Sequence, residues 1–173
     1  IYATSLSLDG YLEQASGDPG WAIPDEELHR HFNDLEQDID THLSGRRMYE
    51  LMAAYWTTAD LSPAATMYEI DYARIWTAVP KVVFSATLEA AGWNARLARG
   101  DAVADVARLK SQPGKDMSVG GLRLASALAA AGLIDEYRFY YVPVLLGSGT
   151  SVFQLIGHRI QLKRIETHTF ASG

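Results

Sequence analysis

Residues 119–128 carry the pattern with the clearest chemical meaning in this sequence. A β-branched run ends at Gly120 and Gly121, and residues with helical apolar spacing begin directly afterwards. This predicts a strand that enters a helix through a turn without side chains, which lets a phosphate approach the backbone closely. The first N–H groups of a helix are unpaired and carry a partial positive charge. The pattern therefore indicates a dinucleotide-phosphate cradle, although an ordinary tight turn gives the same residues.

Two further strand ends carry residues suited to the same ligand. Arg46 and Arg47 follow Gly45 at a predicted helix start, where a cation is unfavourable by about 0.3–1 kcal/mol unless an anion binds. Arginine forms bidentate bonds with phosphate, so the pair indicates a 2′-phosphate or pyrophosphate, the alternative being two solvated arginines. Ser85 ends another β-branched run and could contact a ribose or phosphate, or simply end the strand. Open α/β sheets bind ligands beyond the carboxyl ends of their strands, so these three ends are expected at one edge.

Composition is that of an ordinary globular protein and excludes several functional classes. The 173 residues are 48% hydrophobic and 21% charged, which predicts one domain over residues 1–173. The formal net charge of −6 argues against a nucleic-acid surface, which needs a basic stripe. No apolar run approaches the ~20 residues of a membrane span, and the first residues lack a basic signal segment. We expect a cytoplasmic protein that binds neither membrane nor nucleic acid.

Cysteine and histidine usage argues against metal chemistry. The sequence has no cysteines, which excludes disulfides, thiolate zinc sites and cysteine nucleophiles. Its five histidines show no metal-ligand spacing. We therefore expect no metal site.

The elements that must position these residues alternate along the chain. Alternating and β-branched runs predict strands at 1–8, 40–43, 81–85, 96–98, 117–119, 135–146 and 161–170. Helical apolar spacing predicts helices at 24–39, 46–56, 63–76, 101–110 and 122–131. This order predicts an α/β fold with a mixed, mostly parallel sheet flanked by helices, and with an antiparallel pair of strands at the C-terminus.

Seven short motifs, taken in order, resemble the dihydrofolate reductase superfamily. Their joint order and spacing are most similar to the branch that contains the C-terminal reductase domain of the riboflavin-biosynthesis protein RibD. The motifs cover nearly the whole chain, at residues 7–11, 20–21, 45–50, 81–85, 119–121, 132–136 and 143–149. The resemblance implies a three-layer sandwich that binds NADPH and transfers hydride to a C=N bond or a sugar-derived carbonyl. It also implies a homodimer formed through the strands around residues 137–144.

The resemblance assigns cofactor contacts to particular residues. Gly45, Arg46 and Arg47 match the segment that holds the 2′-phosphate and pyrophosphate, and Ser85 matches the segment beside the adenosine ribose. The first strand, near the nicotinamide carboxamide, contributes Ala3 and Thr4. The residues that match the pyrophosphate turn are Val119, Gly120, Gly121, Leu122 and Arg123. Met48 stands where the family commonly has threonine, which removes one hydroxyl contact.

Catalysis needs a proton donor besides the cofactor, and the sequence leaves its identity open. The resemblance places Asp9 on the substrate side of the first strand, the alternative being the aspartate of an ordinary Asp-Gly turn. Glu26 or Glu27 could face the substrate, or serve only as first-turn acids favoured by the helix dipole. Trp21 matches the loop that covers the nicotinamide, or it anchors the loop on the core.

The expected reaction is reduction of a pyrimidine- or pteridine-like small molecule. The most specific candidate substrate is 5-amino-6-(5-phosphoribosylamino)uracil, whose phosphate would need a second cationic pocket. Arg30, Arg74 and Arg138 are candidates for that pocket. The alternative is a non-catalytic, nucleotide-binding or regulatory relative of the same fold, since fold alone does not fix function.

Overall fold

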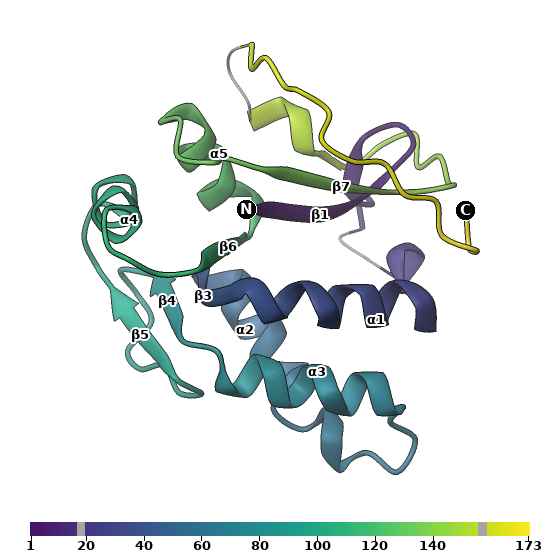
Figure 1. Cartoon of the computed structure of the whole chain (residues 1–173), viewed down its shortest axis with the longest axis horizontal. Helices are drawn as coiled ribbons and strands as arrows, with labels where there is room; N and C mark the ends of the chain where they lie inside the picture. The colour runs from purple at the N-terminus through teal and green to yellow at the C-terminus, as the bar shows by residue number, and fades with distance from the viewer. Residues whose placement is uncertain (17–19, 156–158) are drawn as a thin grey trace.

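The computed structural model describes residues 1–16, 20–155 and 159–173, and centres on a six-stranded sheet (Figure 1). The strand order is β5-β4-β3-β6-β1-β7, and all five pairings are parallel. These strands are β1 (Tyr2–Ser7), β3 (Ile39–Gly45), β4 (Lys81–Phe84), β5 (Ala95–Ala98), β6 (Asp116–Gly120) and β7 (Tyr137–Val142). A separate antiparallel ribbon pairs β2 (Tyr11–Glu13) with β8 (Thr150–Ser151).

Helices cover both faces of the sheet. The α-helices are α1 (Glu26–Leu35), α2 (Arg46–Trp56), α3 (Met67–Ala78), α4 (Ala102–Lys110) and α5 (Leu122–Ala130). Short 3-10 turns lie at η1 (Gly20–Ala22), η2 (Glu36–Asp38), η3 (Ala59–Leu61) and η4 (Val152–Leu155). In Figure 1, α4 and α5 lie on one side of the sheet and α1 and α3 on the other. Among the described residues, no helix combines the length and apolarity needed to cross a membrane.

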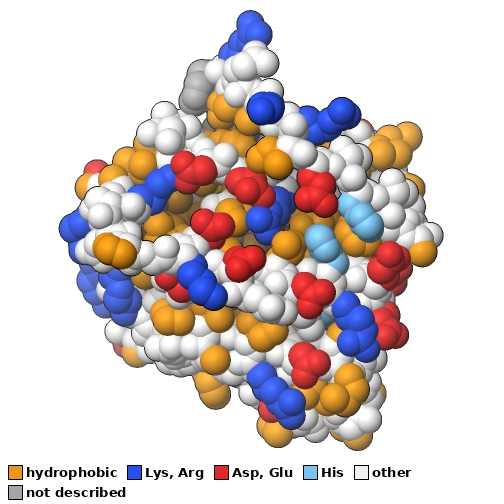
Figure 2. All heavy atoms as spheres, in the orientation of Figure 1, with side chains coloured by type: hydrophobic (Ala, Val, Ile, Leu, Met, Phe, Trp, Pro, Cys, Tyr) orange, Lys and Arg blue, Asp and Glu red, His pale blue; other side chains and the backbone are white. Residues whose placement is uncertain are grey.

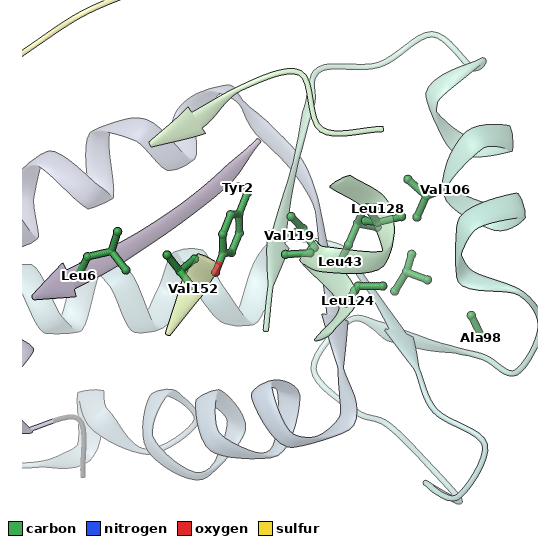
Figure 3. Close-up of a cluster of buried hydrophobic side chains, with 11 residues drawn as sticks. Tyr2, Leu6, Leu43, Ala98, Val106, Val119, Leu124, Leu128 and Val152 are labelled. Atoms are coloured by element: carbon green, nitrogen blue, oxygen red, sulfur yellow. The ribbon is translucent and has the colours of Figure 1, made fainter. Parts of the chain in front are cut away.

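Alternation along the central strands builds two cores. Side chains of successive strand residues point to opposite faces, and Val82 and Val83 on β4 are both buried. Val82 belongs to the cluster of buried residues that includes Leu128 of α5 and that is drawn in Figure 3. Val83 belongs to a second cluster with Tyr49 and Trp76, from α2 and α3. The β-branched run at the start of β4 is therefore buried on both faces, as expected for a central parallel strand.

The predicted fold class is confirmed, and the helix predicted at 46–56 has the same bounds as α2. The helix predicted from residue 63 begins instead at Met67, because Thr66 and Glu69 form a capping box. The long strand predicted at 135–146 is shorter, and ends just before Pro143, which has no N–H to donate to a sheet.

The predicted antiparallel pair at the C-terminus is wrong. β7 runs parallel to β1, from Tyr2 opposite Tyr137 to Ser7 opposite Val142. Residues 161–170 form no strand, and residues 161–169 are exposed, so their alternation has no buried face to stabilise a strand. The segment is held by Phe170, whose ring packs on those of His31 and Tyr140.

A buried lysine joins the end of α3 to the start of β4. The side chain of Lys81 is 3% exposed. Its ammonium donates to the carbonyl oxygens of Trp76, Val79 and Trp93, and lies 4.3 Å from the centre of the Trp76 ring. Burial lowers the pKa of Lys81 to about 8. The carbonyls at the end of the helix are thus satisfied by a cation that is costly to keep charged.

This lowered pKa predicts a pH dependence of stability. Between the folded pKa of about 8 and the ordinary value of 10.5, the unfolded chain binds more protons than the folded chain, so the free energy of unfolding rises with pH. We expect the wild type to gain stability relative to Lys81→Met between pH 8 and 10 in urea denaturation. Lys115→Met, which removes an exposed lysine, should keep the wild-type slope. Equal slopes for the wild type and Lys81→Met would contradict the assignment.

Candidate functional site at the carboxyl edge of the sheet

Three strand ends that the sequence singled out lie side by side. β3 is paired in parallel with both β4 and β6, and the register sets Gly45 opposite Phe84 and Ser44 opposite Gly120. The residues after these positions begin α2, the 85–88 turn and α5. The predicted convergence at the carboxyl edge of the sheet is confirmed by these registers.

Two helices that begin at this edge lack the cap that the others have. Side chains of Asp25, Thr66 and Asp101 accept hydrogen bonds from the first turns of α1, α3 and α4. In contrast, the N-cap residues of α2 and α5 are Gly45 and Gly121, which have no side chain to accept a hydrogen bond from the first turn. Among the described α-helices, these two alone present first-turn N–H groups without a side-chain acceptor. Because α2 and α5 follow the neighbouring strands β3 and β6, their N-termini suit an anion with several oxygens.

Met48 holds the glycine pair in close contact with α2. A Cβ atom at Gly120 would lie 3.0 Å from Met48 Cγ, and one at Gly121 would lie 3.5 Å from Met48 Cβ. Gly121 has φ of +96°, in a region that L side chains rarely adopt. Met48 therefore contributes packing at the position where the family that the chain resembles commonly has a threonine hydroxyl.

Arg46 reaches toward the turn after β4. Its Nη1 donates to Thr87 Oγ1 at 2.9 Å, and its Nε donates to Glu50 Oε1 at 2.8 Å. Ser85 Oγ accepts the N–H of Thr87 at 3.2 Å, which folds the turn back on itself, and Arg99 donates to two backbone carbonyls of the same turn. Arg46 and Ser85 are thus brought together around Thr87. The sequence analysis missed Thr87, although a serine two residues before a threonine at a strand end is a signal for such a turn.

Arg47 points to a different part of the structure. Its Nη2 donates to Glu13 Oε2 on β2 at 3.2 Å, and its side chain is 82% exposed. The two arginines at the start of α2 thus contact segments on opposite sides of the edge. Arg46 faces the β4–β5 side, and Arg47 faces the β2–β8 ribbon.

Residues predicted for the nicotinamide side lie on β1, between β6 and β7. Ala3 and Thr4 pair with Arg138 and Phe139 of β7, and Ala3 is exposed while Thr4 is half-buried. Thr4 Oγ1 donates to the Ser5 carbonyl at 3.4 Å.

Of the remaining residues in the predicted pyrophosphate turn, two belong to the core. Val119 is 4% exposed and lies in the main cluster, against which Leu122 also packs. Their side chains are therefore occupied in packing, which leaves their backbone groups for any ligand contact. Arg123, in the first turn of α5, is exposed.

Asp9 is an acceptor in a turn. Its carboxylate accepts Ser7 Oγ at 2.6 Å, Gly147 N at 2.7 Å and Leu146 N at 3.2 Å. The bond from Ser7, followed by that from Gly147, lowers the pKa of Asp9 below its ordinary value. A proton donor requires the opposite shift. These contacts favour the turn interpretation, in which Asp9 ties the end of β1 to the 146–147 loop.

The other three candidates, Glu26, Glu27 and Trp21, differ in their surroundings. Glu26 accepts Arg30 Nε at 2.9 Å on the outer surface of α1, with a side chain 63% exposed. Glu27 accepts the N–H of Ala171 at 2.8 Å. The indole Nε1 of Trp21 is buried without a hydrogen-bond partner among the described residues. A buried donor without an acceptor costs free energy. Among these candidate residues, Trp21 is therefore the one whose surroundings indicate a polar partner that the described residues do not supply.

A hollow of about 310 Å³ lies at the opposite edge, among the amino ends of the strands. Several charged side chains of its rim already have partners, such as Asp135, which pairs with Lys110, and Asp40, which accepts the Lys115 N–H. On the face seen in Figure 2, acidic and basic side chains are interspersed. We place the site at the carboxyl edge, where the uncapped helices converge and where parallel α/β sheets bind ligands.

Comparison with known proteins agrees with this architecture. The family model of the RibD C-terminal domain matches residues 1–173. The uncharacterized protein YyaP of Bacillus subtilis is 32% identical over all of this chain and 89% of its own length. A putative riboflavin biosynthesis protein of Shewanella has a similar structure, with a TM-score of 0.76, 21% identity, and coverage of 99% and 92% of the two chains. A deaminase/5-amino-6-(5-phosphoribosylamino)uracil reductase of Thermotoga maritima has a TM-score of 0.60 at 18% identity, over 93% of this chain and 48% of its own.

The glycine pair predicts a difference between two single substitutions. Gly121→Ala forces a side chain into the positive-φ region and should lower the free energy of unfolding by about 1–3 kcal/mol. Gly45→Ala is the matched control, because Gly45 is also an N-cap but has φ of −78° and no atom within 4 Å of an added Cβ; it should cost at most about 1 kcal/mol. Chemical denaturation measures both, and equal losses would contradict the backbone geometry described for the turn.

Proposed function

We propose that this chain, which belongs to the RibD C-terminal domain family, is an NADPH-dependent reductase of a pyrimidine- or pteridine-like small molecule. The observation that carries the proposal is the pair of uncapped helix N-termini, α2 and α5, that begin at neighbouring strand ends with Arg46 and Arg47 beside them. Cation-bearing, uncapped helix starts are unfavourable without an anion, and a dinucleotide supplies several phosphate oxygens.

The residues at the edge suit NADPH in particular. In the proposal, the first N–H groups of α2 and α5 donate to the pyrophosphate, on a turn where Gly120 and Gly121 keep side chains away. Arg46, with Thr87 and Ser85, holds the 2′-phosphate that distinguishes NADPH from NADH. When bound, NADPH supplies the hydride, and the chain's task is to bind and orient it.

The nicotinamide is proposed to lie at β1, beside Ala3 and Thr4. Trp21 covers it from the η1 turn, and its Nε1, buried and unsatisfied in this structure, would donate to the substrate or to a bound water only once it becomes accessible. Reduction of a C=N bond or carbonyl consumes one hydride and one proton. Since Asp9 is held ionised by its hydrogen bonds and Glu26 lies in a surface ion pair, we propose that water delivers the proton.

The candidate substrate 5-amino-6-(5-phosphoribosylamino)uracil carries a phosphate that needs a cation. The three arginines considered for it all have acidic partners, since Arg30 pairs with Glu26, Arg74 with Asp71 and Arg138 with Glu136. A phosphorylated substrate would have to open one of these pairs, just as the 2′-phosphate would have to compete with Glu50 for Arg46. We therefore propose the broader substrate class and keep this compound as its most specific member.

A non-catalytic nucleotide-binding relative is the second candidate function. It is favoured by the lowered pKa of Asp9, the opposite of the shift that a general acid needs, and by the position of Glu26 in an exposed ion pair with Arg30. Turnover separates the two candidates, because a binding protein would show cofactor affinity without oxidation of NADPH in the presence of candidate substrates.

The proposal predicts selective stabilisation by NADPH. A ligand at 100 times its Kd stabilises the fold by about 2.7 kcal/mol, so the melting temperature should rise clearly with NADPH and less with NADH. Loss of a charge-assisted bond in Arg46→Gln should weaken NADPH binding by about 10- to 100-fold and leave NADH unchanged.

The matched control is Arg108→Gln, which removes a half-exposed arginine from α4 and should bind NADPH as the wild type does. If neither cofactor shifts the melting temperature of the wild type, the reductase and the nucleotide-binding candidates both fail.

A further inference from the structure

Arg47 is held by a carboxylate at the helix end where the proposed phosphates bind. The Nη2 atom lies 3.2 Å from Glu13 Oε2, while the first turn of α2 contains no acidic residue of its own. Glu13 therefore reaches this helix end from another element, β2. It is the acid that pairs with the second arginine of the motif.

Of these two partners, the carboxylate is the fixed one. Glu13 is 26% exposed, and its Oε1 accepts Thr150 Oγ1 at 3.0 Å across the β2–β8 ribbon. The ribbon is tightly closed at this point, since a Cβ at Gly149 would lie 2.0 Å from the Glu13 carbonyl oxygen. Arg47, with 82% of its side chain exposed, is the partner that is able to move.

The Arg47–Glu13 ion pair contributes less free energy than the contacts that a phosphate would make at this helix N-terminus. Exposed pairs of this kind contribute about 0–1 kcal/mol. A phosphate group at a helix N-terminus gains both the backbone N–H donors and a bidentate arginine. A bound phosphate therefore draws Arg47 away from Glu13, at the cost of breaking the pair.

We propose that Glu13 competes with the phosphates of NADPH for Arg47, and so lowers the affinity of the protein for its cofactor. This inference rests on the proposed function and adds a residue that sets the strength of cofactor binding. On release of Arg47, Glu13 keeps its bond to Thr150, so the ribbon stays closed while the arginine turns to the ligand.

The opposite role makes the opposite prediction. If Glu13 instead positions Arg47 for the cofactor, removal of its charge weakens binding. If Glu13 only stabilises the ribbon, removal of its charge changes the melting temperature and leaves affinity unchanged. The sign of one measured difference therefore decides between competition and the other two roles.

The experiment is a titration of the full chain with NADPH, followed by calorimetry or cofactor fluorescence, in four forms: wild type, Glu13→Gln, Arg47→Gln and the double variant. Glu13→Gln should bind NADPH about two- to fivefold more tightly, the equivalent of losing one exposed pair. Arg47→Gln should bind more weakly than wild type. The double variant should match Arg47→Gln, because Glu13 acts only through Arg47.

Asp105→Asn is the matched control. Asp105 pairs with Arg108 on α4 at 3.2 Å and is 29% exposed, so it resembles Glu13 in ion-pair length and burial and removes the same charge. It should leave the NADPH affinity unchanged. Weaker or equal binding by Glu13→Gln, an equal gain in Asp105→Asn, or a gain that persists in the Arg47→Gln background would each overturn the proposal.

A parallel titration with inorganic pyrophosphate separates this inference from the proposed function. If pyrophosphate binds and NADPH does not, the proposed function fails, and the order of pyrophosphate affinities among the same variants decides the role of Glu13. If the wild type binds neither, both proposals are overturned.

Discussion

The close contact between Met48 and the glycine pair at 120–121 is the constraint on which the candidate site depends. It needs β3 and β6 to be parallel neighbours in a register that sets Ser44 opposite Gly120. A Cβ at residue 120 would lie 3.0 Å from Met48 Cγ, so the Met48 side chain would have to shift by a few tenths of an ångström, and residue 121 has a positive φ. Given these conditions, two helices start side by side with their first N–H groups uncapped.

Around this contact, the charged side chains at the edge form hydrogen bonds and ion pairs with different neighbouring segments. Arg46 is drawn to the turn that Ser85 folds, and Arg47 is drawn to Glu13 on the β2–β8 ribbon. The carboxylate of Asp9 ties the end of β1 to the loop that leads back to that ribbon. Residues distant in sequence thus meet through side chains that are satisfied locally, whereas the first N–H groups of α2 and α5 have no side-chain acceptor among the described residues.

Much of the fold, and the meeting of the three strand ends at one edge, could be predicted from sequence, because both depend on local patterns. Apolar spacing predicted the bounds of α2, and the alternation of strands and helices predicted that the ends of β3, β4 and β6 lie together. That a ligand binds beyond these ends stays a prediction. The C-terminal segment could not be predicted this way, since its alternation resembles that of a strand but its residues 161–169 have no buried face. The separate directions of Arg46 and Arg47 were also beyond prediction, because adjacent residues in sequence give no sign of partners 34 and 41 residues away.

Backbone amide chemical shifts on titration with NADPH test most directly whether the N-termini of α2 and α5 bind its phosphates. We predict that the largest changes occur at residues 46–48 and 122–124, with the amides that line the hollow at the opposite edge nearly unchanged. Changes concentrated at that hollow, among residues 110–117, or an absence of change at both helix starts, would contradict it.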